Sequence, residues 1–120
     1  MARSPLAYLS DIVESCHAIE TALRGVDLAT YGSNRLIRSA VESEFTIIGE
    51  AVGSLTRLDP QATARISHAR MIVGFRNQLT HDYAAIDDTT VWAIAVHDVP
   101  VLRRECEALL AEVSSEGKAD

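Results

Sequence analysis

Apolar residues recur every three or four positions along most of the chain, which is the spacing of one face of an α-helix. The first such run begins at Ser4-Pro5, a capping residue followed by a proline that helices accept in their first turn. Its apolar positions are Leu6, Leu9, Val13, Cys16, Ile19 and Leu23, and Gly25 ends it. The pattern predicts an N-terminal helix, followed by a loop through Tyr31-Gly32-Ser33.

A second, longer run predicts a helix in the middle of the molecule. Its apolar positions form a wide stripe: Leu36, Ile37, Ala40, Val41, Ile47, Ile48, Ala51, Val52 and Leu55. Because one neighbouring helix does not cover a stripe of this width, we expect several neighbours. Asp59-Pro60 stops this helix and begins a short third one.

Two further runs complete the chain. A fourth helix carries Ile66, Met71, Ile72, Phe75 and Leu79. The last begins at the cap Asp87-Asp88 and extends through Trp92 to Val113. Pro100 interrupts it and removes one backbone donor, so we expect a kink near His97. No useful strand-like alternation is present in the sequence, so the pattern favours an all-helical protein.

The predicted fold is therefore all-α: one domain over residues 1–120, built as a four- to five-helix bundle with a kinked last helix. The polar tail, residues 114–120, is expected to fray. A chain of 120 residues with 48% apolar residues can bury a core without disulfide or metal staples. Cys16 and Cys106 occupy apolar helical positions, so we expect reduced core thiols.

The apolar runs do not indicate a secreted or membrane protein. Met1-Ala-Arg-Ser-Pro lacks the long apolar segment of a secretory signal. No run approaches the roughly 20 residues that span a bilayer. We therefore expect a soluble, cytoplasmic protein with no membrane partner.

The net charge is −6, yet arginines gather in the second half of the chain. Between residues 57 and 81 four arginines (Arg57, Arg65, Arg70, Arg76) accompany one acid, Asp59, a local charge of +3. Arg35 and Arg38 could join this patch. Such a run is ordinarily a solvated helix face, but a basic patch on an acidic protein can also attract a phosphate backbone. Arg65 and Arg70 are therefore candidates for binding RNA.

The basic patch leads into Arg76-Asn77-Gln78-Leu79-Thr80-His81-Asp82-Tyr83. Arginine binds phosphate bidentately and stabilises charge that develops on it. Histidine gains and loses a proton near neutral pH. Together they can drive an RNA 2′-hydroxyl onto its adjacent phosphate without a metal ion, with Asn77 helping to align them. In an unbroken helix, however, residues five apart lie about 140° apart around the axis. Either the helix ends or distorts near Thr80, or a second chain supplies half of the site.

The motif and its surroundings resemble the HEPN superfamily, and within it the HepT-type toxins. The mark of these toxins is Arg, four residues, His, one residue and Tyr, which Arg76, His81 and Tyr83 match. Elsewhere the matching stretches are Ile48-Gly49-Glu50-Ala51, Val91-Trp92 and Val99-Pro100-Val101-Leu102. The chain departs from its relatives at Ala84-Ala85, where an aromatic residue is common.

This resemblance implies a homodimer whose cleft contains both copies of the motif. It implies a metal-independent ribonuclease with no cofactor, in which Arg76 and His81 are catalytic and Asn77 and Glu50 support them. It further implies a toxin whose partner, a minimal nucleotidyltransferase antitoxin, silences it by transferring AMP onto Tyr83.

Two alternatives remain open. The chain could be a catalytically weak HEPN domain that only binds a nucleotidyltransferase. It could also be a structural dimerising bundle, in which Arg76 and His81 are buried in ion pairs, Arg76 with Glu50. A metal site is not expected, because Glu14-Ser15-Cys16-His17 has the spacing of helical di-iron proteins but no second copy.

Overall fold

The computed structural model describes residues 3–81 and 86–119, and helices dominate both stretches. They are α1 (Pro5–Ala22), α2 (Leu28–Ser33), α3 (Arg35–Leu58), α4 (Pro60–Thr63), α5 (Ala69–His81), α6 (Asp88–His97) and α7 (Val99–Ala119). No strand occurs within the described stretches, which confirms the all-α prediction. The predicted helices correspond to α1, α3, α4, α5 and the kinked last helix, which is the pair α6 and α7, and the structure adds one short helix, α2.

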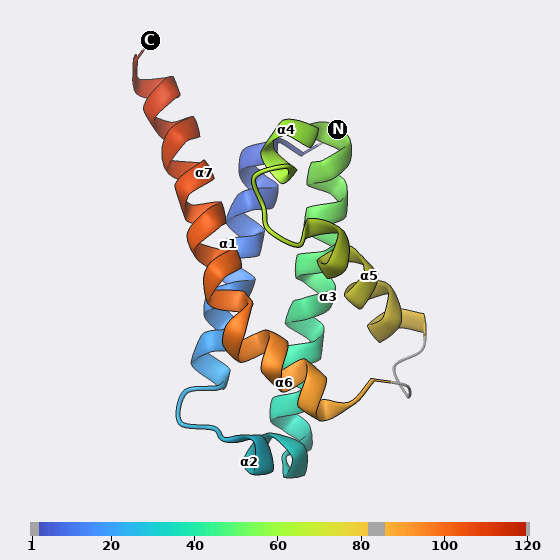
Figure 1. Cartoon of the computed structure of the whole chain (residues 1–120). Coiled ribbons are helices and arrows are strands. Elements are labelled where there is room, and N and C mark those ends of the chain that lie inside the picture. Colours follow the sequence, from blue (N-terminus) through green and yellow to red (C-terminus); the bar gives the residue numbers. More distant parts are fainter. Residues whose placement is uncertain (1–2, 82–85, 120) are drawn as a thin grey trace.

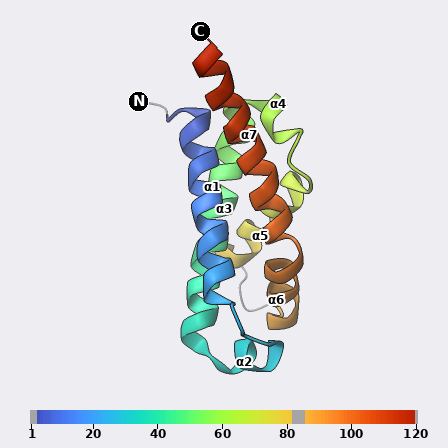
Figure 2. The ribbon, with the colours of Figure 1, turned by 90° about the vertical axis from the view of Figure 1, so that its left-hand side faces the viewer.

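The long helices α1, α3 and α7 run along the length of the molecule (Figures 1 and 2). α1 packs against both α3 and α7, whereas α5 packs on α3 and α6 on α7. α3 therefore has α1, α2, α4 and α5 as neighbours, as its wide apolar stripe predicts. The core lies between these helices, and its most deeply buried side chains include Leu9, Ile12, Ile19, Val41, Ile48, Val52 and Leu55.

Side-chain caps explain where several helices begin. The Ser4 hydroxyl accepts a hydrogen bond from the backbone N–H of Ala7, and the Asp59 carboxylate accepts one from Ala62. Asp87 does the same for Thr89 at the start of α6. Each cap satisfies an N–H group that the first helical turn leaves without a partner. The helix starts predicted at Ser4, Asp59 and Asp87 are therefore confirmed.

The predicted loop through Tyr31-Gly32-Ser33 is wrong, because these residues belong to helix α2. The Asp27 carboxylate caps α2 by accepting a hydrogen bond of 2.8 Å from the backbone N–H of Thr30. Tyr31 is fully buried and ties this short helix to the core. A helix of 6 residues is too short to show a period in its apolar positions, so the pattern did not reveal it.

The last helix is broken where Pro100 predicts a kink. α6 ends at His97 and α7 begins at Val99, so that Asp98 separates them. Pro100 lies in the first turn of α7, where its missing N–H costs no helical hydrogen bond. The other end of α7 projects beyond the bundle (Figure 1) and is helical to Ala119, through the segment expected to fray.

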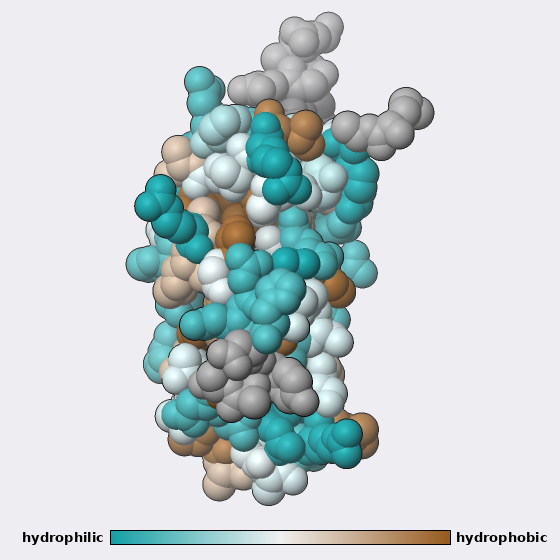
Figure 3. Space-filling model, turned by 90° about the vertical axis from the view of Figure 1, so that its right-hand side faces the viewer, coloured by the Kyte–Doolittle hydropathy of each residue, from teal (hydrophilic) through white to brown (hydrophobic). Residues whose placement is uncertain are grey.

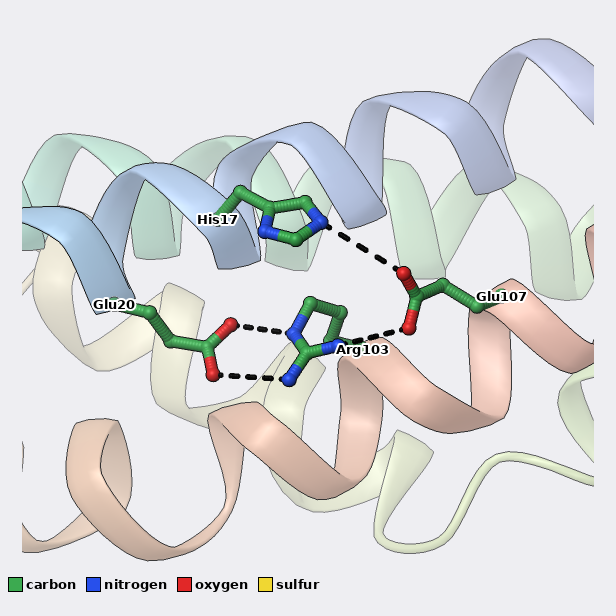
Figure 4. Close-up of polar contacts among 4 residues, drawn as sticks. All are labelled: His17, Glu20, Arg103 and Glu107. Atoms are coloured by element: carbon green, nitrogen blue, oxygen red, sulfur yellow. Dashed lines mark hydrogen bonds and ion pairs between the residues drawn. The ribbon is translucent and has the colours of Figure 1, made fainter.

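Four polar side chains join α1 to α7 (Figure 4). Arg103 donates to both carboxylate oxygens of Glu20, at 2.5 and 3.2 Å, and to Glu107 at 2.9 Å. His17 Nε2 lies 3.7 Å from the other oxygen of Glu107. His17 therefore belongs to a structural network, and no three potential metal ligands gather within the described part of the chain.

The apolar interior agrees with the expected state of the cysteines. Cys16 on α1 and Cys106 on α7 are both buried and both are free thiols. No helix in the described stretches is long and apolar enough to cross a membrane.

Candidate active site

The motif helix α5 approaches α3 closely at Gly49. A Cβ atom on Gly49 would lie 2.1 Å from Cβ and 2.4 Å from Cγ of Arg76, so only a hydrogen atom fits between the helices there. One turn earlier on α3, Phe45 meets Phe75 edge-to-face with ring centroids 5.1 Å apart. These two contacts fix the position of α5 against α3, and with it the position of the Arg76 side chain.

Arg76 is held by two of the residues predicted to support it. One terminal nitrogen donates to Oε1 of Glu50 at 2.9 Å, and the other donates to Oδ1 of Asn77 at 3.0 Å. The Arg76 side chain is 26% exposed, and that of Glu50 is 58% exposed. Since a guanidinium has five N–H groups, both terminal nitrogens keep a further donor that can bind an anion.

His81 is the last residue of α5, and it is exposed. The helix continues through Thr80, whose hydroxyl donates to the backbone carbonyl of Arg76 at 2.9 Å. α5 is therefore helical as far as His81, one residue beyond the position near Thr80 where the sequence predicted an end or a distortion. Within one chain Arg76 and His81 lie about 140° apart around the helix axis.

The two arginines proposed to bind RNA are placed differently. Arg70 is exposed on α5 and lines a groove between α3, α4 and α5. Arg65 instead forms an ion pair of 2.5 Å with Glu112 of α7, in a depression lined also by α1. The structure thus places Arg70, but not Arg65, in a groove lined by α5, the helix that carries Arg76. The Tyr83 prediction lies outside the described residues.

Two residues of this region were not singled out from the sequence as site residues. Gly49 appeared only as part of a matching stretch, although a glycine inside a helical pattern often marks a close packing contact. Arg57 was counted in the basic patch, but only the structure shows that it lines the same groove as Arg70.

The buried thiols are unsuited to nucleophilic chemistry. Burial raises the pKa of Cys106 to about 12, and it raises the pKa of Cys16 as well. Because the thiolate is the reactive form, neither cysteine offers an alternative catalytic group near neutral pH.

Comparisons with known proteins identify one family. A family model described as "Ribonuclease HepT-like" matches residues 12–109. A protein of Methanocaldococcus jannaschii described as "Putative RNase" is 33% identical over 105 residues, which cover 88% of this chain and 95% of the relative. A "Probable ribonuclease HepT" of Thermococcus cleftensis is 32% identical over 113 residues, covering 91% and 98%. No solved structure gives a significant match.

Proposed function

We propose that this chain, which belongs to the HepT-like ribonuclease family, cleaves RNA without a metal ion at a site that combines Arg76 and His81 from two copies of the chain. The observation that carries the proposal is the helical state of α5 through His81. In a single chain, Arg76 is therefore held by Glu50 and Asn77 on one face of α5, and the exposed His81 lies on another face. A two-fold homodimer that apposes two α5 helices would supply both groups to one cleft.

The chemistry proposed is transfer of the phosphate within the RNA strand. Arg76 binds the scissile phosphate and stabilises the charge that develops on its oxygens. The 2′-oxygen loses its proton and bonds to phosphorus while the bond from phosphorus to the 5′-oxygen breaks. The departing 5′-oxygen takes up a proton, leaving a 2′,3′-cyclic phosphate and a 5′-hydroxyl end. His81 acts as general base or general acid in these proton transfers.

The first prediction is that Arg76→Ala and His81→Ala each lower RNA cleavage by at least about 100-fold, since each removes a group that the proposed reaction needs. Cleavage of a labelled RNA in the presence of EDTA measures the effect, and circular dichroism checks the helices. His97→Ala is the matched control, because His97 is also the exposed last residue of a helix. Cleavage that disappears with EDTA and returns with magnesium would contradict the mechanism.

The biological role proposed is that of a toxin neutralised by a minimal nucleotidyltransferase. Expression of the chain alone should then arrest growth, and His81→Ala should abolish the arrest. The alternative, a catalytically weak domain that only binds such an enzyme, predicts normal growth with both chains.

The second prediction concerns Tyr83, the proposed target of the antitoxin. Its phenol oxygen would bond to the α-phosphate of ATP, and pyrophosphate would leave. The attached AMP places a negative phosphate and a purine in the path of the RNA, so both charge and bulk oppose binding. Intact-mass analysis after co-expression should show one added AMP, which Tyr83→Phe abolishes and the control Tyr8→Phe does not. Added AMP that maps to Tyr8 or Tyr31 would refute this assignment.

A further inference from the structure

A groove of about 480 Å³ opens between the second half of α3, α4 and the first half of α5, the helix that carries Arg76. Its floor is apolar and includes Gly53, Ala69 and Val73, while Arg57 and Arg70 stand at its rim. This volume lies within the range of small-molecule sites. Figure 3 looks at the α5 side of the molecule, where hydrophilic side chains surround paler, less polar ones.

The charge in this groove is not compensated. No carboxylate is among the described residues that line it. Within the part of the chain whose side chains are described, neither Arg57 nor Arg70 has an ion pair, and Arg57 donates a hydrogen bond to the Ser54 hydroxyl at 3.2 Å. By contrast, Arg65, Arg76 and Arg103 each bind a carboxylate. Two free guanidinium groups on an acidic chain therefore share one concave surface, and such a surface attracts an anion.

The groove also lies next to the candidate site along the same two helices, α3 and α5. Gly53 follows Gly49 by one helical turn, which is roughly 6 Å along α3. On α5, Val73 precedes Arg76 by three residues and so lies on nearly the same side of that helix. A strand with one phosphate at Arg76 can therefore extend into the groove.

We propose that this groove binds the RNA strand beside the scissile phosphate, with Arg57 and Arg70 on a flanking phosphate and the apolar floor under the ribose and base. The proposal rests on the proposed cleavage of RNA. Because no aromatic side chain lines the groove among the described residues, it contributes affinity for the phosphate backbone and little preference for a base.

The test is binding of a short fluorescent RNA in which 2′-O-methyl groups block cleavage, measured over a range of salt concentrations. Arg57→Gln and Arg70→Gln should each weaken binding roughly fivefold. Each should also reduce the slope of log affinity against log salt by about 0.7, the value for one lost contact with a single-stranded phosphate. Arg24→Gln is the control, because Arg24 is exposed in the connection between α1 and α2. This connection lies at the end of the bundle opposite α4 (Figure 1).

Measuring RNA cleavage distinguishes the proposed groove from the proposed ribonuclease activity on which it rests. The two variants should cut a dinucleotide, which does not reach the groove, as fast as the unaltered chain, but should show a raised KM for longer RNA. Thr56→Glu, on the same rim, adds a negative charge and should weaken binding independently.

Three outcomes would contradict the proposal that the groove binds RNA. Unchanged affinity and salt slope in all three variants, with an unaltered chain that cuts RNA, refutes the groove alone. A changed oligomeric state in Arg57→Gln or Arg70→Gln, seen by sedimentation, means that a second copy covers it. An unaltered chain that neither binds nor cuts any RNA refutes the proposed function and the groove together.

Discussion

Two thiols and a phenol are buried in their neutral forms. Burial raises the pKa of Cys106 to about 12 and raises those of Cys16 and Tyr31 also. In the unfolded chain a thiol ionises at about pH 8.5. Since the folded state disfavours the charged form, the stabilisation is complete below that pH and is lost as the pH rises towards the folded pKa.

The third prediction is therefore a loss of stability in alkali. The free energy of unfolding, measured with urea, should fall by about 2–3 kcal/mol per thiol between pH 7.5 and pH 10.5. Cys106→Ala should start less stable because of the cavity but lose less on the same change of pH. An equal loss in this variant would show that the thiol does not contribute.

At the scale of elements, the contact between α3 and α5 decides how the candidate site is presented. Gly49 lets the backbone of α5 approach α3, and Glu50, one residue later, binds the guanidinium of Arg76 at 2.9 Å. Gly49 thus allows α5 to pack closely against α3, and the neighbouring Glu50 orients Arg76. A change in the spacing of these helices would displace Arg76 without altering any residue of the motif.

The fourth prediction tests this spacing. Gly49→Ala should lower the free energy of unfolding by about 1–3 kcal/mol, because the new methyl group overlaps the Arg76 side chain. RNA cleavage should fall with it. The control is Gly74→Ala on α5, where a Cβ would meet no atom within 4 Å. Because alanine has less conformational freedom than glycine in the unfolded chain, this change should raise the free energy of unfolding by roughly 0.5–1 kcal/mol. Full activity in Gly49→Ala would show that cleavage does not depend on the spacing of α3 and α5.

At the scale of the whole molecule, the separation of Arg76 and His81 around α5 makes the site depend on assembly. In a dimer with a shared cleft, each reaction would use the arginine of one chain and the histidine of the other. Two inactive variants then complement each other, because a mixed dimer of Arg76→Ala and His81→Ala retains one intact pair.

The fifth prediction is that mixing these two purified variants, after subunits exchange, restores RNA cleavage to a substantial fraction of the unaltered rate. Neither variant alone should recover on the same treatment, and sedimentation should show a dimer. A mixture of exchanged subunits that stays inactive would mean that each reaction takes both groups from one chain. A chain that is monomeric at micromolar concentration would contradict the shared site altogether.

Much of the fold followed from the sequence because helix starts and stops are encoded within a few residues. Ser4, Asp59 and Asp87 cap the helices that their positions predicted, and Pro100 lies beside the break between α6 and α7. The helix α2 was missed for a related reason. α2 is too short to show a helical period in its apolar positions. Its buried residue, Tyr31, is covered only when the other helices pack around it.

The sequence by itself determined the all-α class, most helix boundaries and the motif residues, because these depend on local backbone chemistry and on spacing along one helix. Only the tertiary structure decided which arginines could serve a site. Arg65 is paired with Glu112 of α7, whereas Arg57 and Arg70 share a groove and Arg76 is held by Glu50. Each of these outcomes joins residues that are distant in the chain, and their meeting depends on how α3, α4, α5 and α7 pack, which no local pattern specifies.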